Sequence, residues 1–172
     1  SLQERFAKYR EEKVKALELQ RKERAGLRAR PRTEEEKNAL REKFIAKAKE
    51  YIGVPYAKRY CDPGTEEYES ELFLDCCGLV RRAMRDLQDD FGFRIGGWNQ
   101  AYQYDTLSEN EVTEEEAKPG DLIFWAAEYV NPKQRVFKFN MVHVEIYLGE
   151  GRTLGSRWRK GKVSEFESYK FE

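Results

Sequence analysis

The chain has 172 residues and a formal net charge of zero, and hydrophobic residues make up 40% of it. This length allows one packed domain with an appendage and excludes two full hydrophobic cores. The charged fraction of 37% is well above the quarter that is typical of globular chains, which predicts a long solvated segment. Neither an apolar run of membrane-spanning length nor a signal peptide is visible, so we expect no membrane span and a cytoplasmic location.

The N-terminal segment, residues 1–32, is strongly basic. It holds eleven basic and five acidic side chains, a charge of +6, so the rest of the chain carries −6. Residues 2–25 predict one helix, because Glu, Lys, Arg, Leu and Ala dominate them and neither Pro nor Gly occurs. The apolar stripe of this helix is thin. We therefore expect an extension that is either solvated or docked on an acidic partner, followed by a domain over residues 33–172.

Helices come first in this predicted domain. Thr33 begins a capping box before a helix that ends near Tyr51. Asp75 is predicted to cap the next helix, which ends near Gly92, and residues 96–102 indicate a further short helix. The pattern then changes to strands, which we expect at residues 122–129, 136–148, 152–159 and 162–171. Helices followed by an antiparallel sheet make an α+β fold.

Three cysteines occur, Cys61, Cys76 and Cys77, and they do not predict a disulfide framework. Adjacent cysteines rarely bridge to each other, because the bond strains the backbone. A zinc site is also unexpected, since the chain has one histidine and no Cys-x-x-Cys pair. We therefore predict no metal or other cofactor and a reducing location.

Cys76 is a candidate nucleophile at the start of the helix that Asp75 caps. The unpaired N–H groups and the positive dipole end at a helix N-terminus lower the pKa of a thiol and can bind an oxyanion. His143 lies in a predicted strand with Glu145 on the same face, and as the only histidine it would be the base. Taken singly, each residue also fits a structural role, such as a buried apolar cysteine.

Four short segments occur in a set order: residues 51–56 (Tyr-Ile-Gly-Val-Pro-Tyr), 75–80 (Asp-Cys-Cys-Gly-Leu-Val), 119–124 (Pro-Gly-Asp-Leu-Ile-Phe) and 143–149 (His-Val-Glu-Ile-Tyr-Leu-Gly). Over about residues 40–158, this series closely resembles the NlpC-type cell-wall peptidase family, a branch of the papain-like cysteine hydrolases. The resemblance implies that Cys76 is the nucleophile and His143 the general base. It also implies that Tyr56 lines the site and that Asp75 recognises the amine end of the substrate.

Three positions depart from the family's pattern. Cys77, which we place with Tyr56 and Asp75 among the expected substrate-binding residues, stands where the family usually has Ser or Ala, so a hydroxyl that could bind the substrate is lost. The polar residue that orients the base would fall at position 155, which is Gly155, while Glu145 replaces a glycine two residues after the base. Glu145 could orient His143, although side chains at i and i+2 of a strand run parallel, or it could be a rim residue of an altered pocket.

The resemblance implies hydrolysis of an amide, in a peptide or isopeptide bond, by a Cys76 thiolate with His143 as base. Two alternatives stay open: an acyltransferase that uses the same pair, and a catalytically reduced binding module. We expect a peptide or small amide as the substrate, chosen by the loop 57–74 and the connection 126–140. The acidic side chains of the loop 57–74 favour a cationic or amine-bearing substrate, unless this is an ordinary solvated loop. The oligomeric state is not predicted.

Overall fold

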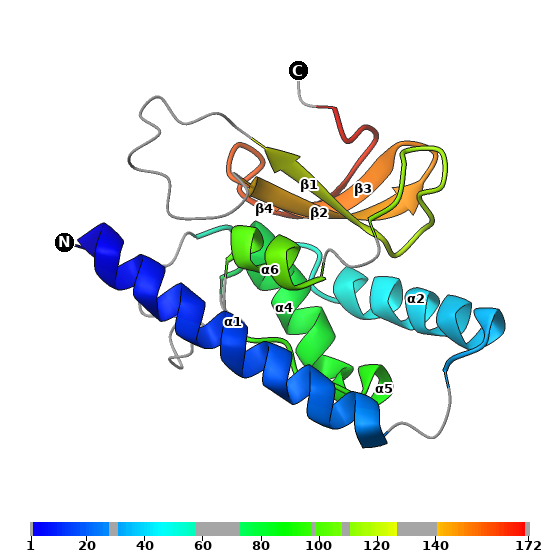
Figure 1. Cartoon of the computed structure of the whole chain (residues 1–172). Coiled ribbons are helices and arrows are strands. Elements are labelled where there is room, and N and C mark those ends of the chain that lie inside the picture. Colours follow the sequence, from blue (N-terminus) through cyan, green and yellow to red (C-terminus); the bar gives the residue numbers. More distant parts are fainter. Residues whose placement is uncertain are drawn as a thin grey trace.

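The computed structural model describes residues 2–27, 31–57, 73–97, 99–107, 111–126 and 141–170. Within these ranges, helices precede an antiparallel sheet, which confirms the α+β fold (Figure 1). The helices are α1 (Leu2–Leu27), α2 (Glu34–Lys49), α4 (Cys76–Asp86), α5 (Gln88–Phe91) and α6 (Gln100–Leu107), and the strands are β1 (Leu122–Ala126), β2 (Met141–Gly149), β3 (Arg152–Arg157) and β4 (Lys162–Phe166).

The predicted caps begin their helices as expected. The Thr33 hydroxyl accepts a hydrogen bond from the backbone N of Glu36 (3.2 Å), and a carboxylate oxygen of Asp75 accepts one from the backbone N of Gly78 (2.8 Å). Each side chain satisfies one of the N–H groups that the first helical turn leaves without an internal partner. The two caps therefore fix where α2 and α4 start.

The helix predicted to run from Asp75 to near Gly92 is instead two helices. At Leu87 the backbone leaves the helical region (φ −109°, ψ 22°), and α5 resumes for four residues. Gly92 then ends α5 with φ 79°, a left-handed conformation that glycine adopts without steric cost. The predicted short helix also starts later, at Gln100 instead of residue 96.

The sheet has the strand order β1-β2-β3-β4, with each neighbouring pair antiparallel. Its two central strands are β2 and β3, whose register pairs Ile146 with Leu154 and Tyr147 with Thr153. The strand β4 ends at Phe166, short of the predicted residue 171. Residues 127–140, which include the expected ends of two strands, lie outside the described residues.

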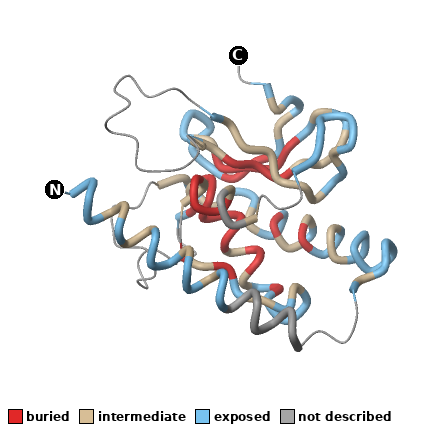
Figure 2. The backbone as a smooth tube through the Cα atoms, in the orientation of Figure 1, coloured by how far each residue is buried: buried red, intermediate tan, exposed pale blue. Residues whose placement is uncertain are grey.

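The core lies between α4 and the face of the sheet that carries Val144 and Ile146. These two side chains are fully buried, as are Leu79 and Val80 of α4. Figure 2 shows buried segments in both the sheet and the helical layer. Because side chains alternate along a strand, residues 143, 145 and 147 belong to the opposite face of β2. The strand thus buries apolar residues against the helices and carries the predicted base on its other face.

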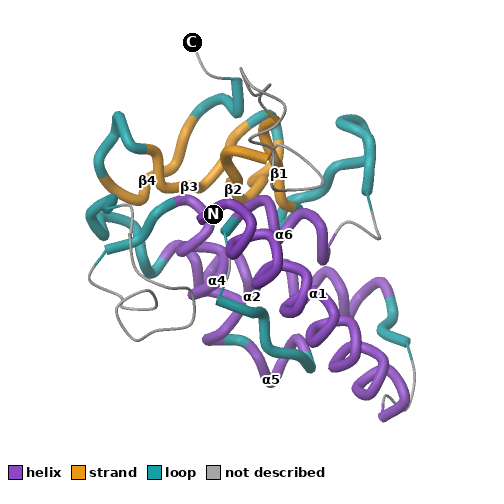
Figure 3. Tube along the Cα trace, turned by 60° about the vertical axis from the view of Figure 1, so that its left-hand side comes forward, coloured by secondary structure: helices purple, strands orange, loops and turns teal. Residues whose placement is uncertain are grey.

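Helix α1 packs on α6 at the side of the helical layer away from the sheet (Figures 1 and 3). Over residues 2–19, where burial is described, its half-buried residues recur at helical spacing: Phe6, Ala7, Tyr9, Arg10, Val14 and Leu17. Arg32 then donates hydrogen bonds to the backbone oxygens of Asp90 and Phe91 (2.7 and 2.8 Å), next to α5. The division of the chain at residue 32 stays a prediction. Among the described residues, none of the helices combines the length and apolar character that crossing a bilayer requires.

Candidate active site

Cys76 is the first residue of α4 and only 7% exposed. Its sulfur lies 3.9 Å from the side-chain oxygen of Gln100, the first residue of α6. The amide nitrogen of Gln100 donates to the backbone oxygen of Met141 (3.2 Å), which begins β2. Gln100 therefore links the candidate nucleophile to the strand that carries the candidate base.

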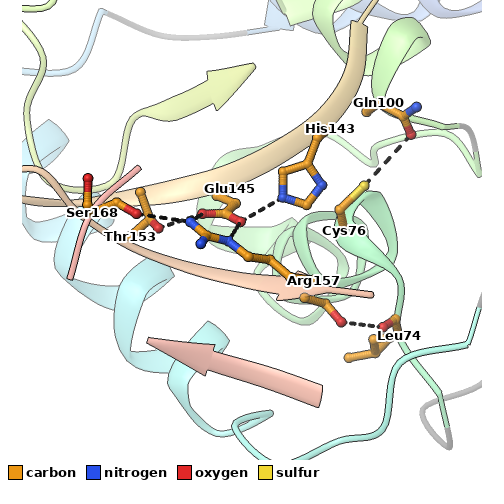
Figure 4. Close-up of polar contacts among 9 residues, drawn as sticks. Leu74, Cys76, Gln100, His143, Glu145, Thr153, Arg157 and Ser168 are labelled. Carbon is orange, nitrogen blue, oxygen red and sulfur yellow. Dashed lines mark hydrogen bonds and ion pairs between the residues drawn. The ribbon is translucent and has the colours of Figure 1, made fainter. Parts of the chain in front are cut away.

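His143 lies between Cys76 and Glu145 (Figure 4). Its Nε2 is 2.6 Å from a carboxylate oxygen of Glu145, and because an ionised carboxylate only accepts hydrogen bonds, Nε2 is the donor. With Nε2 held in this way, Nδ1 is the nitrogen left to exchange a proton with the thiol. The ring also packs against Trp125, its partner on β1, with ring centroids 5.1 Å apart.

The two titratable groups shift each other's pKa in opposite directions. A hydrogen bond from Cys77 has the largest effect on Cys76; burial opposes it, and the hydrogen bond and charge of His143 help to lower the pKa of Cys76 to about 6. Burial lowers the pKa of His143, but hydrogen bonds with Cys76 and Glu145 outweigh it and raise this pKa to about 9. Between these two values the pair is a thiolate next to an imidazolium, which is the reactive form of a cysteine nucleophile.

Glu145 is fully buried, and its carboxylate accepts four hydrogen bonds. Besides His143, its donors are the Thr153 hydroxyl (2.5 Å) and the Nε and Nη2 atoms of Arg157 (2.7 and 2.9 Å) (Figure 4). Burial raises the pKa of Glu145, but the hydrogen bonds from His143, Arg157 and Thr153 hold it below its ordinary value. A buried charge is thus fully paired, as it must be to stay ionised.

The space above Gly155 is taken by Glu145. A Cβ atom built on Gly155 would lie 2.5 Å from Cγ and 2.7 Å from Cδ of Glu145, closer than real Cβ contacts. The register that pairs Ile146 with Leu154 also brings Glu145 opposite Gly155 when it is continued by one residue. The side chain of Glu145 therefore fills the space that a side chain at position 155 would need, so the two departures from the family's pattern depend on each other.

Asp75 and Cys77, which the sequence assigned to substrate binding, contact each other. The Cys77 thiol lies 3.3 Å from the carboxylate oxygen of Asp75 that caps α4, and Cys77 is only 2% exposed. A hydrogen bond with Cys76, then burial and the charge of Asp75, raise the pKa of Cys77 well above its ordinary value. Cys77 thus stays a protonated thiol, and the substrate-binding role of both residues stays a prediction.

Tyr56 lies beside the turn between β3 and β4, since its backbone N donates to the oxygen of Gly161 (2.8 Å). Its predicted place in the lining of the site stays a prediction. Ser156 donates to the backbone oxygen of Leu74 (2.6 Å) and so belongs to the core face of β3, away from His143. Cys61 and most of the two segments expected to choose the substrate, residues 58–72 and 127–140, lie outside the described residues.

Three residues of this site were not predicted from the sequence: Gln100, Thr153 and Arg157. Thr153 and Arg157 had a usable signal, because they flank Gly155 at two residues on either side and so share its face of the strand. Gln100 had none, since it reaches Cys76 only through the packing of α6. Within the ranges that the structure describes, no three His, Cys, Asp or Glu side chains are grouped as metal ligands.

Comparison with known proteins points to one family. A model of the NlpC/P60 family matches residues 59–170, which is more than half of the chain. The chain is 25% identical to the NlpC/P60 domain of the peptidoglycan hydrolase SagA (TM-score 0.50; 73% of this chain and 87% of that chain covered). It is 25% identical to the P60 domain of an antigen of M. avium subspecies paratuberculosis (TM-score 0.54; 77% of this chain and 88% of that chain covered). It is 26% identical to the peptidoglycan hydrolase RipB of Mycobacterium tuberculosis (TM-score 0.55; 90% of this chain and 75% of that chain covered). No protein of curated function matches the sequence.

Proposed function

The chain belongs to the NlpC/P60 family, and from that premise we propose that it is a cysteine amide hydrolase with Cys76 as nucleophile and His143 as general acid and base. Two proteins that the chain resembles, SagA and RipB, are named as peptidoglycan hydrolases. The observation that carries the proposal is the line of contacts from Cys76 through His143 to the buried carboxylate of Glu145. Such a line of nucleophile, base and orienting group is what cysteine hydrolysis requires.

The chemistry follows from the charges of this pair. The Cys76 thiolate attacks the carbonyl carbon, and the backbone N–H groups at the start of α4 stabilise the oxyanion that forms. The His143 imidazolium then gives its proton to the leaving amine as the C–N bond breaks. Neutral His143 next takes a proton from water, the resulting hydroxide attacks the thioester, and the thiolate leaves.

Glu145 would keep the imidazole in the tautomer that this cycle needs. Its carboxylate holds the proton on Nε2, so Nδ1 faces the thiol in both the charged and the neutral ring. The binding-module alternative drew on the departures at positions 145 and 155. These departures no longer favour a binding module, because Glu145 supplies His143 with a polar partner from the place where a side chain at position 155 would be.

Labelling with a thiol-reactive electrophile, followed by peptide mapping, tests the nucleophile. We expect Cys76 to react near pH 7 well ahead of Cys77 and Cys61, because the pKa of Cys76 is lowered to about 6 and that of Cys77 is raised. Cys76→Ala should abolish labelling and turnover. The matched variant is Cys77→Ser, whose hydroxyl can still donate to the Cys76 sulfur and which should keep the labelling of Cys76. Equal labelling of the three thiols, or a preference for Cys77, would overturn the assignment.

Product analysis tests the reaction itself. A cell-wall peptide is the first substrate to try, since SagA and RipB are peptidoglycan hydrolases. Hydrolysis predicts a free carboxylate and a free amine in equal amounts, detected by mass spectrometry. An acyl group recovered on an added amine or lipid instead of on water would favour the acyltransferase.

A further inference from the structure

We propose that Arg157 is a positioning residue of this site, which acts through Glu145 on His143, and that the Thr153–Gly155–Arg157 face of β3 is a cradle for a carboxylate donated by β2. The inference rests on the proposed function and goes beyond it: the orienting group has moved from one central strand to the other. Four observations support the proposal.

The first is the shape of the cradle. Thr153 and Arg157 stand on either side of Gly155 on one face of β3, and both donate to the same carboxylate. Gly155 leaves the gap between them, which Cγ and Cδ of Glu145 fill. A side chain at the central position would close the gap, and an apolar residue at either flank would leave at least one buried carboxylate oxygen with one donor instead of two.

The second observation is the geometry of the ion pair. Arg157 makes two hydrogen bonds, from Nε to one carboxylate oxygen and from Nη2 to the other. Such a bidentate pair fixes the plane of the carboxylate, whereas a single hydrogen bond leaves it free to rotate. The oxygen that accepts from Nε is also the one that accepts from His143, so Arg157 sets the direction in which the base is held.

The third observation is that Arg157 is itself held in place. Its guanidinium lies 3.7 Å from the centre of the Phe166 ring on β4, and its Nη2 also donates to the backbone oxygen of Ser168 (3.0 Å; Figure 4). The side chain is 15% exposed. Contacts from three directions fix the guanidinium before any substrate binds, which is what a positioning group needs.

The fourth observation answers the objection that residues 143 and 145 run parallel on one strand and should meet poorly. The carboxylate does reach His143, at 2.6 Å. It does so while bound to two donors on the neighbouring strand, Thr153 and Arg157. The contact within β2 is thus supported from β3, and we infer that it depends on that support.

The test is the pH dependence of Cys76 alkylation by iodoacetamide, measured on the full chain by peptide mapping between pH 4 and 9. Arg157→Met removes the two hydrogen bonds that Arg157 donates to Glu145. The pKa of Glu145 should therefore rise, and its carboxylate should stabilise the imidazolium of His143 less. The midpoint of Cys76 alkylation should then rise by about one pH unit. Arg159→Met is the matched control: it removes an exposed arginine of the following turn and should leave the midpoint unchanged.

A double-mutant comparison shows whether Arg157 acts through Glu145. Glu145→Gln alone should raise the midpoint as Arg157→Met does, and the combined variant should add nothing further. If Arg157 is purely structural, Arg157→Met should lower the melting temperature but have the same alkylation midpoint as Arg159→Met, and this result would overturn the proposal. Shifts of Arg157→Met and Glu145→Gln that add up in the combined variant would also overturn it. Arg157→Lys keeps the charge but loses the bidentate contact of the guanidinium with Glu145, so its alkylation midpoint should be intermediate. This variant decides the question if Arg157→Met does not fold. An unchanged midpoint in Arg157→Lys would also overturn the proposal.

The same data separate this inference from the proposed function. A wild-type midpoint at the ordinary thiol value of about 8.5 would mean that Cys76 and His143 do not form the reactive pair, and both proposals would fall. A lowered wild-type midpoint that is insensitive to Arg157 and Glu145 would leave the nucleophile in place and remove only the cradle.

Discussion

At the scale of single residues, His143 illustrates how one side chain can serve two partners. Glu145 occupies Nε2, and the thiol of Cys76 is on the other side of the ring. The imidazolium stabilises the thiolate, and the thiolate and carboxylate both stabilise the imidazolium. Removing any one member therefore changes the protonation of the others, which makes pH profiles the most informative measurement on this site.

His143→Ala should move Cys76 alkylation to higher pH and slow acylation. The hydrogen bond from Cys77 is the largest influence that lowers the pKa of Cys76, and it remains in this variant, but the hydrogen bond and charge of His143 are lost. The sign follows: without the cation, the thiolate forms only at higher pH. The measurement is the alkylation rate against pH, with Cys76→Ser as the blank. An unchanged profile would mean that His143 lies outside the site.

Gly155→Ala should cost both activity and stability in the wild-type background. The new methyl group would overlap Glu145, whose Cγ is 2.5 Å from the ideal Cβ position, and such overpacking typically costs about 1–3 kcal/mol. Gly155→His should also lower activity and stability, because its side chain would overlap Glu145 even though it restores a polar group at that position. Denaturant unfolding and turnover are the measurements.

The Glu145→Gly background provides the control for this prediction. With the side chain of Glu145 removed, Gly155→Ala should have a much smaller effect on unfolding, because the three atoms nearest to the new methyl group all belong to that side chain. Equal destabilisation in both backgrounds would show that the two positions do not share one space.

At the scale of elements, the start of α4 combines a structural and a chemical task. Asp75 ends the preceding loop, caps the helix and lies within reach of Cys77. The cap decides that Cys76, and not a later residue, occupies the position where the helix exposes its N–H groups. A change at Asp75 therefore affects the reactivity of the thiol as well as the stability of the helix.

Two substitutions at Asp75 separate these tasks. Asp75→Asn keeps an oxygen for the backbone N of Gly78 and removes the charge that, among weaker influences than the Cys77 hydrogen bond, raises the pKa of Cys76. We expect a nearly unchanged melting temperature and alkylation at lower pH. Asp75→Ala loses the cap and should destabilise the protein by about 1 kcal/mol. A higher KM in Asp75→Asn would support the predicted contact with the substrate amine, and an alkylation profile shifted to higher pH would contradict the electrostatic argument.

Local patterns predicted most of these elements, and long-range contacts explain what they missed. Thr33 and Asp75 mark helix starts because a cap is a local interaction. The break at Leu87 was not predicted, since the apolar pattern continues through it. The position of Glu145 suggested a role, but its contact with His143 depends on donors from β3 that only the strand register brings near. Gln100 belongs to a helix whose packing on β2 no local pattern shows.

At the scale of the whole molecule, α1 meets the rest of the helical layer mainly through α6. Deleting residues 1–30 should leave cooperative unfolding and Cys76 alkylation intact, because none of residues 2–19 is fully buried and the half-buried ones form a thin stripe. The deletion should stop before Arg32, which donates to the backbone of Asp90 and Phe91. Thermal unfolding checks this, with Arg32→Ala in the full chain as the comparison. A large loss of melting temperature on deletion would show that α1 is part of the domain. Docking of this helix on an acidic partner stays a prediction.

The proposed base His143 and the hydrogen-bonding partners of Glu145 come from one hairpin, β2 and β3, and the contacts of Glu145 join residues no more than twelve positions apart in the chain. The proposed nucleophile, Cys76, belongs to the helical layer and meets that hairpin only when the sheet docks on α4. A chain emerging from the ribosome therefore carries an ordinary, mostly protonated cysteine until docking is complete. If Cys76 is the nucleophile as proposed, folding itself is the activation step, and the unfinished protein is spared the oxidation and adduct formation to which a thiolate is exposed.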